Sequence, residues 1–151
     1  EYLEELLKSL VDINESKIKR KPILLKLSPD MTQKELDDVL KIITELKIDG
    51  VIATNTTLSR YDLKSKNRNE KGGLSGKPLS NKSTELIRYI YNKTNGKLPI
   101  IGAGGIFTSK DAKEKLDAGA SLLQIYTALV YEGPTIVGHI NKKLNNEKNN
   151  L

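Results

Sequence analysis

The sequence predicts an α/β protein made of four successive βα units, which we interpret as half of a (β/α)8 TIM barrel. Short, almost wholly apolar runs alternate with longer amphipathic segments, as in strands that are covered on both faces. Such units form either a doubly wound open sheet or a barrel. A complete barrel needs about 250 residues. The 151 residues of this chain therefore hold four of the eight units.

Each predicted strand is a short apolar run next to turn residues. Asp49-Gly50 and Asn95-Gly96 close the segments that precede the second and third strands, and residues 118–120 (AGA) lead into the fourth. The four strands are expected at residues 22–27, 51–54, 98–102 and 122–126.

The predicted helices carry apolar residues at helical spacing on one face. A capping box at residues 32–35 (TQKE) begins the second helix, whose apolar face includes Leu36 and Leu40. Residues 145–151 are expected to form a frayed polar tail, which leaves residues 1–144 as the barrel segment. The helices are expected at residues 1–13, after Thr32, after Ser80, after Thr108 and at residues 134–144.

Composition argues against several functions. The chain is 37% hydrophobic and 29% charged, as in a soluble globular domain, and has no run of about 20 apolar residues that could span a membrane. The lack of cysteine excludes disulfides and thiolate metal sites, and a single histidine argues against a histidine-rich metal site. The net charge of +6 comes from lysines spread over every predicted helix among 19 acidic residues. We therefore expect no metal, no nucleic acid and a solvated surface.

Candidate ligand groups follow every predicted strand. In α/β barrels the active site lies at the carboxyl ends of the strands, and the loops after the seventh and eighth strands commonly bind phosphate. These ends carry Lys26, residues 54–56 (TNT), Gly104-Gly105 and Tyr126-Thr127.

Lys26 ends an apolar strand, where an unpaired ammonium group is unfavourable to bury. Two interpretations are open: a ligand meets this charge, or a neighbouring carboxylate such as Asp30 pairs with it. Two interpretations are also open for the glycine turns at residues 101–106 (IGAGGI) and 72–76 (GGLSG). They either present backbone N–H groups to a phosphate or only make tight turns, and the third glycine of a dinucleotide fingerprint is missing.

A long stretch without periodicity, residues 55–79, is predicted to be a loop of the kind kept for function. Its basic part, residues 60–71, is interpreted as a solvated mobile segment, with a role as a lid as the alternative. His139 lies in the last predicted helix beside Lys142 and Lys143 and is expected to be structural.

Five segments between Pro22 and Gly133 form a specific pattern when they are taken together. They are residues 26–30 (KLSPD), 49–57 (DGVIATNTT), 72–79 (GGLSGKPL), 99–106 (PIIGAGGI) and 118–126 (AGASLLQIY). In order and spacing they resemble dihydroorotate dehydrogenase of the membrane-associated, quinone-using class (class 2). The resemblance implies that this chain is the C-terminal half of that family's barrel.

The resemblance implies FMN as cofactor and assigns roles to the first two strand ends. Lys26 matches the lysine near N1 and O2 of the flavin ring, where negative charge appears on reduction. Thr54 matches a further flavin contact. Asn55 and Thr56 match the pair that hydrogen-bonds the pyrimidine, and an amide both donates to and accepts from an imide edge.

The glycine turns and the last strand receive roles in the same way. Gly76 and Gly105 match backbone flavin-binding positions, and Tyr126-Thr127 matches the dipeptide whose main chain holds the phosphate. Relatives often have serine at the position of Thr127, and backbone donation survives that change.

The activity that the resemblance implies is FMN-dependent oxidation of (S)-dihydroorotate to orotate, with quinone as acceptor, in de novo pyrimidine biosynthesis. It makes the parent protein an oxidoreductase acting on CH-CH donors. The family's base is a serine in the N-terminal half of the barrel, so we expect no catalytic residue here, and none of Ser28, Ser59, Ser75 or Ser121 takes that role.

The family's quinone tunnel and membrane-binding helices also precede this segment. The parent enzyme is therefore expected at a bacterial or mitochondrial inner membrane, through segments absent here. The chain alone is expected to be soluble and inactive, with the N-terminal half of the barrel as its partner.

Two other functions stay open. One is a different FMN- or phosphate-binding barrel oxidoreductase, against which Asn55-Thr56 beside Lys26 argues. The other is a basic nucleic-acid-binding module, which lacks interleaved aromatic residues for base stacking, since aromatics are only 5% of the chain.

Overall fold

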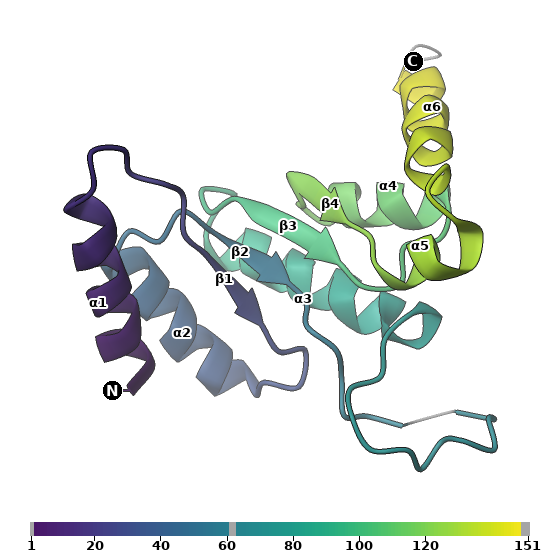
Figure 1. Ribbon diagram of the computed structural model, residues 1–151, viewed down its shortest axis with the longest axis horizontal. Helices are drawn as coiled ribbons and strands as arrows, with labels where there is room; N and C mark the ends of the chain where they lie inside the picture. Colours follow the sequence, from purple (N-terminus) through teal and green to yellow (C-terminus); the bar gives the residue numbers. More distant parts are fainter. Residues whose placement is uncertain (1, 61–62, 149–151) are drawn as a thin grey trace.

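A four-stranded parallel sheet with the strand order β1-β2-β3-β4 forms the centre of the chain (Figure 1). The computed structural model describes residues 2–60 and 63–148, with side chains to residue 146. The elements in chain order are α1 (Tyr2–Glu15), β1 (Leu24–Leu27), α2 (Gln33–Glu45), β2 (Gly50–Ala53), the 3-10 turn η1 (Lys77–Leu79), α3 (Ser80–Lys93), β3 (Ile100–Ala103), α4 (Ser109–Asp117), β4 (Leu122–Gln124), α5 (Thr127–Glu132) and α6 (Ile136–Lys148).

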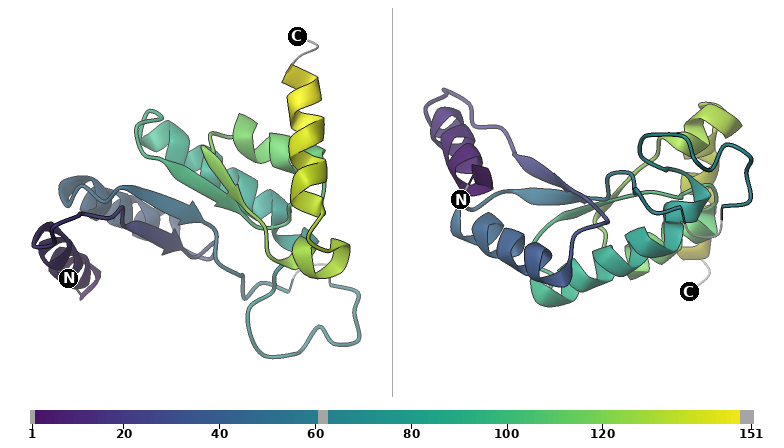
Figure 2. Two further views of the ribbon diagram at one scale, coloured as in Figure 1. Left: turned by 45° about the horizontal axis from the view of Figure 1, so that its top comes forward. Right: turned by 90° about the horizontal axis from the view of Figure 1, so that it is seen from below.

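The sheet is singly wound, because each strand pairs with the one before it in the chain. A doubly wound sheet would reverse its strand order at a switch point and place helices on both faces. Here α2 and α3 lie on the same side of the sheet (Figure 2), and α4 packs on β4. The predicted α/β fold class, half of a (β/α)8 barrel with four βα units, is confirmed.

Two groups of buried apolar side chains hold the helices to the sheet. The larger one joins α1, α2 and α3 to the sheet, and the smaller one joins α4, α5 and α6. Ile43, Val51, Ile87, Ile90 and Ile100 have no exposed surface. Complete burial of such side chains stabilises the fold by roughly 1.5–3 kcal/mol each.

Capping boxes begin two helices. The Thr32 side chain accepts from the N–H of Glu35, whose carboxylate accepts from the Thr32 N–H, as predicted. Thr108 and Asp111 form the same reciprocal pair at the start of α4. Both boxes fix the point at which the chain leaves a loop at the carboxyl end of the sheet.

The C-terminal elements differ from the predicted ones. The prediction missed α5, because its six residues are too few to show a helical period. It also ended the last helix too early: α6 continues through Lys148, so the expectation of a frayed tail is wrong for residues 145–148. Asn145 and Asn146 are exposed, and backbone hydrogen bonding is enough to continue the helix there. Residues 149–151 lie outside the described part of the chain.

Large apolar side chains are exposed at both ends of the sheet. Leu122 on β4 is 64% exposed and Val130 on α5 is 73% exposed, while Leu6 and Ile13 on α1 are also open to solvent. No helix in the described residues has the length and apolar character to cross a bilayer.

Candidate functional site at the carboxyl ends of the strands

A cavity of about 300 Å³ lies at the carboxyl ends of the four strands. This volume is within the range of small-molecule and cofactor sites. The structure brings all eight predicted site residues into its wall: Lys26, Thr54, Asn55, Thr56, Gly76, Gly105, Tyr126 and Thr127.

Lys26 is exposed toward this cavity, and no hydrogen bond or ion pair with another described residue engages its ammonium group. The alternative of an ion pair with Asp30 is wrong. Asp30 instead binds Lys82 and the hydroxyl of Thr57. The charge of Lys26 is therefore available to a ligand.

Asp30 joins two loops at the carboxyl ends of the strands, and this role was not predicted from the sequence. Its carboxylate accepts from the Thr57 hydroxyl at 2.5 Å and from the Leu58 N–H at 2.7 Å, which ties the loop after β1 to the loop after β2. Partial burial raises the pKa of Asp30, but the hydrogen bonds from Lys82, Thr57 and Leu58 lower it to about 2. The carboxylate thus stays ionised and holds the segment next to Asn55.

The segment after β2 is hydrogen-bonded to the ends of the two neighbouring strands, β1 and β3. Thr54 is buried, and its N–H donates to the Ala103 carbonyl at 2.9 Å, while the Asn55 N–H donates to the Leu27 carbonyl at 2.7 Å. The side-chain oxygen of Asn55 accepts from the Thr56 N–H at 2.9 Å. The amide NH₂ of Asn55 donates to none of the described residues, so it remains free for a ligand.

The two glycine turns have conformations that require glycine. Gly105 has φ of +72°, and a Cβ there would lie 2.5 Å from the Ser80 Cβ. Gly76 has φ of +79° and lies against Thr127, whose hydroxyl is 3.0 Å from the Ser75 hydroxyl. Within the described residues, no hydrogen bond is made by the N–H groups of Gly104 and Gly105. Both glycines line the cavity, and their N–H groups have no partner among the described residues.

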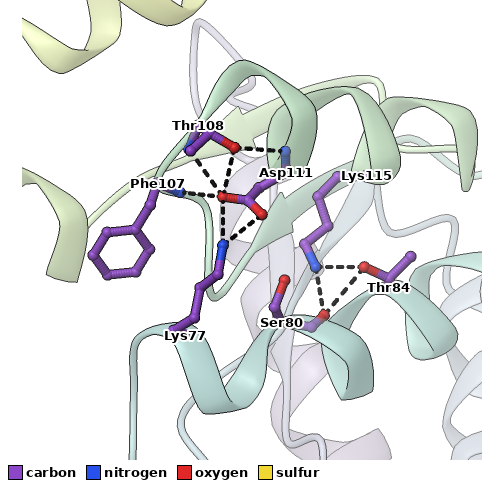
Figure 3. A network of polar contacts seen from close by, with 7 residues as sticks. All are labelled: Lys77, Ser80, Thr84, Phe107, Thr108, Asp111 and Lys115. Carbon is purple, nitrogen blue, oxygen red and sulfur yellow. Dashed lines mark hydrogen bonds and ion pairs between the residues drawn. The ribbon is translucent and has the colours of Figure 1, made fainter.

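A polar network behind the glycine turns was not predicted from the sequence (Figure 3). The carboxylate of Asp111 accepts from Lys77, from Thr108 and from the Phe107 N–H. Partial burial raises its pKa, but Lys77 and the two other donors bring the pKa below the usual value.

Lys115 forms the second part of this network. Its side chain is fully buried, and its ammonium group donates to the Ser80 carbonyl at 2.6 Å and to the Thr84 hydroxyl at 2.5 Å. Desolvation lowers the pKa of Lys115 to about 8, against smaller opposing effects of Glu114 and Asp111.

Two other predicted features lie outside the cavity. His139 is exposed on α6 and lines a separate hollow beside α4. In the loop, the Arg60 guanidinium donates to the carbonyls of Thr57, Glu70 and Gly72, which holds the two ends of residues 60–71 together. Tyr61 and Asp62, which belong to this basic stretch, are outside the described residues. Residues 2–60 and 63–148 contain no group of three metal-ligating side chains.

The fold and the cavity together define half of an α/β barrel with a cavity at the carboxyl ends of its strands. The chain belongs to the dihydroorotate dehydrogenase family, whose model matches residues 2–147. The resemblance inferred from the five segments is thereby confirmed.

Individual relatives agree with this assignment. The chain is 57% identical to a dihydroorotate dehydrogenase (quinone) of Christiangramia forsetii, over 95% of this chain and 42% of the relative. It is 51% identical to that of Trichodesmium erythraeum, over 91% of this chain and 38% of the relative. A crystal structure of ligand-free type DHODH from Eimeria tenella superimposes with a TM-score of 0.89 and 34% identity, over 97% of this chain and 46% of the other. The chain thus spans less than half the length of these relatives.

Proposed function

We propose that the protein containing this chain oxidises (S)-dihydroorotate to orotate with FMN as cofactor and quinone as electron acceptor, in pyrimidine biosynthesis. The convergence of the eight family-matched residues on one cavity is the observation that carries this proposal. In the proposed enzyme the chain is the C-terminal half of the barrel, and the membrane and quinone contacts come from other segments.

The residues in the cavity wall fit FMN. The unsatisfied N–H groups of Gly104 and Gly105 suit a phosphate, and the lack of a Cβ at Gly105 lets the backbone of this turn approach Ser80 closely. Gly76 and Tyr126-Thr127 are the other proposed main-chain contacts of the cofactor, and Thr54 is a further flavin contact. When bound, FMN supplies the acceptor for the hydride that leaves C6 of dihydroorotate.

Lys26 and Asn55 act on the reacting groups in this proposal. The ammonium group of Lys26, free of any described carboxylate, places a positive charge where reduction adds negative charge. Asn55, through its free amide NH₂, binds and orients the pyrimidine together with Thr56, and both residues line the cavity. The base that removes the C5 proton comes from outside this chain, because the family's serine matches none of its residues.

Two substitutions test this assignment in the full-length protein, meaning a polypeptide of the relatives' length. Lys26→Ala is expected to slow flavin reduction in stopped-flow experiments about a hundredfold, while dihydroorotate binding weakens much less. Asn55→Ala is expected to raise the dissociation constant of dihydroorotate about tenfold with normal FMN content.

Lys34→Ala, at an exposed position of α2, is the matched control and should change neither quantity. A colourless protein without flavin, or an unchanged reduction rate in the Lys26 variant, would refute the proposed function. Reduction by another donor but not by dihydroorotate would identify a different flavin oxidoreductase.

A further inference from the structure

Two side chains on one face of α4 reach the same neighbouring segment. Asp111 and Lys115 are four residues apart, which is about one helical turn, and therefore project from the same face of α4. Both point toward residues 77–80, which connect Gly76 in the cavity wall to α3 (Figure 3).

Asp111 binds the first end of this segment. Its two carboxylate oxygens are 2.7 and 2.9 Å from the Lys77 ammonium group, and one of them also accepts from the N–H groups of Phe107 and Thr108. The Asp111 side chain is only 10% exposed. One carboxylate thus joins the turn after β3 to the residue that follows Gly76.

Lys115 binds the other end of the segment. Its ammonium group, with no exposed surface, contacts Ser80 and Thr84 on α3 but no carboxylate among the described residues. A charge placed there without an ionic partner is unfavourable for stability. Stability alone therefore does not explain a lysine at this position.

Residues 77–80, which Asp111 and Lys115 contact at either end, pack against the turn at Gly104-Gly105. A Cβ on Gly104 would lie 3.0 Å from the Leu79 side chain, and one on Gly105 would lie 2.8 Å from the Ser80 nitrogen. Gly104, Gly105, Gly76 and Leu79 all line the cavity. A shift of residues 77–80 would therefore move both turns.

We propose that Asp111 and Lys115 are positioning residues that hold residues 77–80 against the turn at Gly104-Gly105 and so set the geometry of the phosphate-binding part of the cavity. This inference rests on the proposed FMN site. Neither side chain lines the cavity, and both act through Lys77 and Ser80.

The test compares Lys115→Met and Asp111→Asn with Lys113→Met in the full-length protein. Lys113 is on the same helix, but it is exposed and its ammonium group pairs only with Asp117 among the described residues, so it is a matched control. The first two variants are expected to raise the FMN dissociation constant at least about tenfold at a temperature well below unfolding, and the control should leave it unchanged.

Hydrogen exchange in the flavin-free protein gives a second result that does not depend on FMN. Amides of Leu79, Ser80, Phe107 and Thr108, each of which donates a hydrogen bond, should exchange at least about tenfold faster in the two variants, whereas those of β1 and β2 should not change. If Lys115→Met does not fold, Thr84→Val removes one acceptor of the same ammonium group and Lys77→Gln removes the Asp111 contact at an exposed position.

The outcomes separate the two proposals. Unchanged FMN affinity together with unchanged or uniformly faster exchange would overturn the positioning role and leave the proposed function intact. Faster exchange confined to the amides of residues 79–80 and 107–108, in a protein that binds no FMN at all, would support the positioning role and refute the proposed function.

Discussion

The carboxylate of Asp30 accepts a 2.5 Å hydrogen bond from the hydroxyl of Thr57, and this contact joins the loops that follow β1 and β2. Lys26 precedes the first of these loops, and Asn55-Thr56 begin the second. The relative position of the two proposed ligand-binding groups therefore depends on a residue outside the cavity wall.

Asp30→Asn is expected to lower the free energy of unfolding by about 1–2 kcal/mol at pH 7, because a charge-assisted hydrogen bond and the contact with Lys82 are lost. The folded-state pKa of about 2 is below the ordinary 3.8, so this stabilisation is complete above pH 4 and disappears as the pH falls toward 2. Denaturant titrations of wild type and variant at pH 7 and pH 3 measure the difference. Asp38→Asn, exposed on α2, should have little effect at either pH.

The buried ammonium group of Lys115 predicts a second rise of stability with pH, in the alkaline range. Its folded-state pKa of about 8 is below the ordinary 10.5. Between these two values the unfolded chain binds the extra proton, so the stability of the wild type should rise with pH by at most ~3 kcal/mol relative to Lys115→Met. Unfolding free energies at pH 7.5 and pH 10 measure this rise. Parallel curves for the two proteins would show that the lysine is not desolvated.

Gly105→Ala is expected to destabilise the protein by at least ~2 kcal/mol and to abolish FMN binding. Alanine is strained at φ of +72°, and its Cβ would collide with Ser80. Gly138→Ala is the matched control, since no atom lies within 4 Å of the added Cβ and the helix gains up to ~1 kcal/mol. Thermal unfolding and flavin fluorescence measure both effects. An equally mild effect of the two substitutions would contradict the close contact with Ser80.

The chain by itself, residues 1–151, is expected to show no dihydroorotate oxidation, to bind FMN weakly and to associate in solution. Within the described residues β1 and β4 each have one neighbour, and such open edges pair with other chains. Size-exclusion chromatography and flavin fluorescence test this, and adding the proposed N-terminal half in trans should restore turnover. Sustained turnover by this chain alone would show that the base has been assigned to the wrong half.

The order of the βα units, and eight of the residues that line the cavity, were predicted from the sequence and its family resemblance. Strands covered on both faces are apolar runs, capping boxes are four-residue patterns, and turns with positive φ need glycine. Parallel strands end at one edge of a sheet, so Lys26, Thr54 and Tyr126 were predicted to lie together without any knowledge of distances. The family resemblance assigned the proposed roles at these positions, and the structure leaves those roles as predictions.

Which polar side chains support that wall depends on how the helices pack in the folded chain. The helix Ser109–Asp117 contains Lys110, Lys113 and Lys115, and local spacing alone does not separate a solvated lysine from a buried one. Burial depends on which face docks against α3, and this placed Lys115 next to Ser80. An ion pair of Asp30 with Lys26 was one of two open interpretations, but the strand direction carries the Lys26 side chain to the cavity while Asp30 reaches Thr57, which is 27 residues away. Partners so distant in sequence are fixed by packing, which local patterns do not encode.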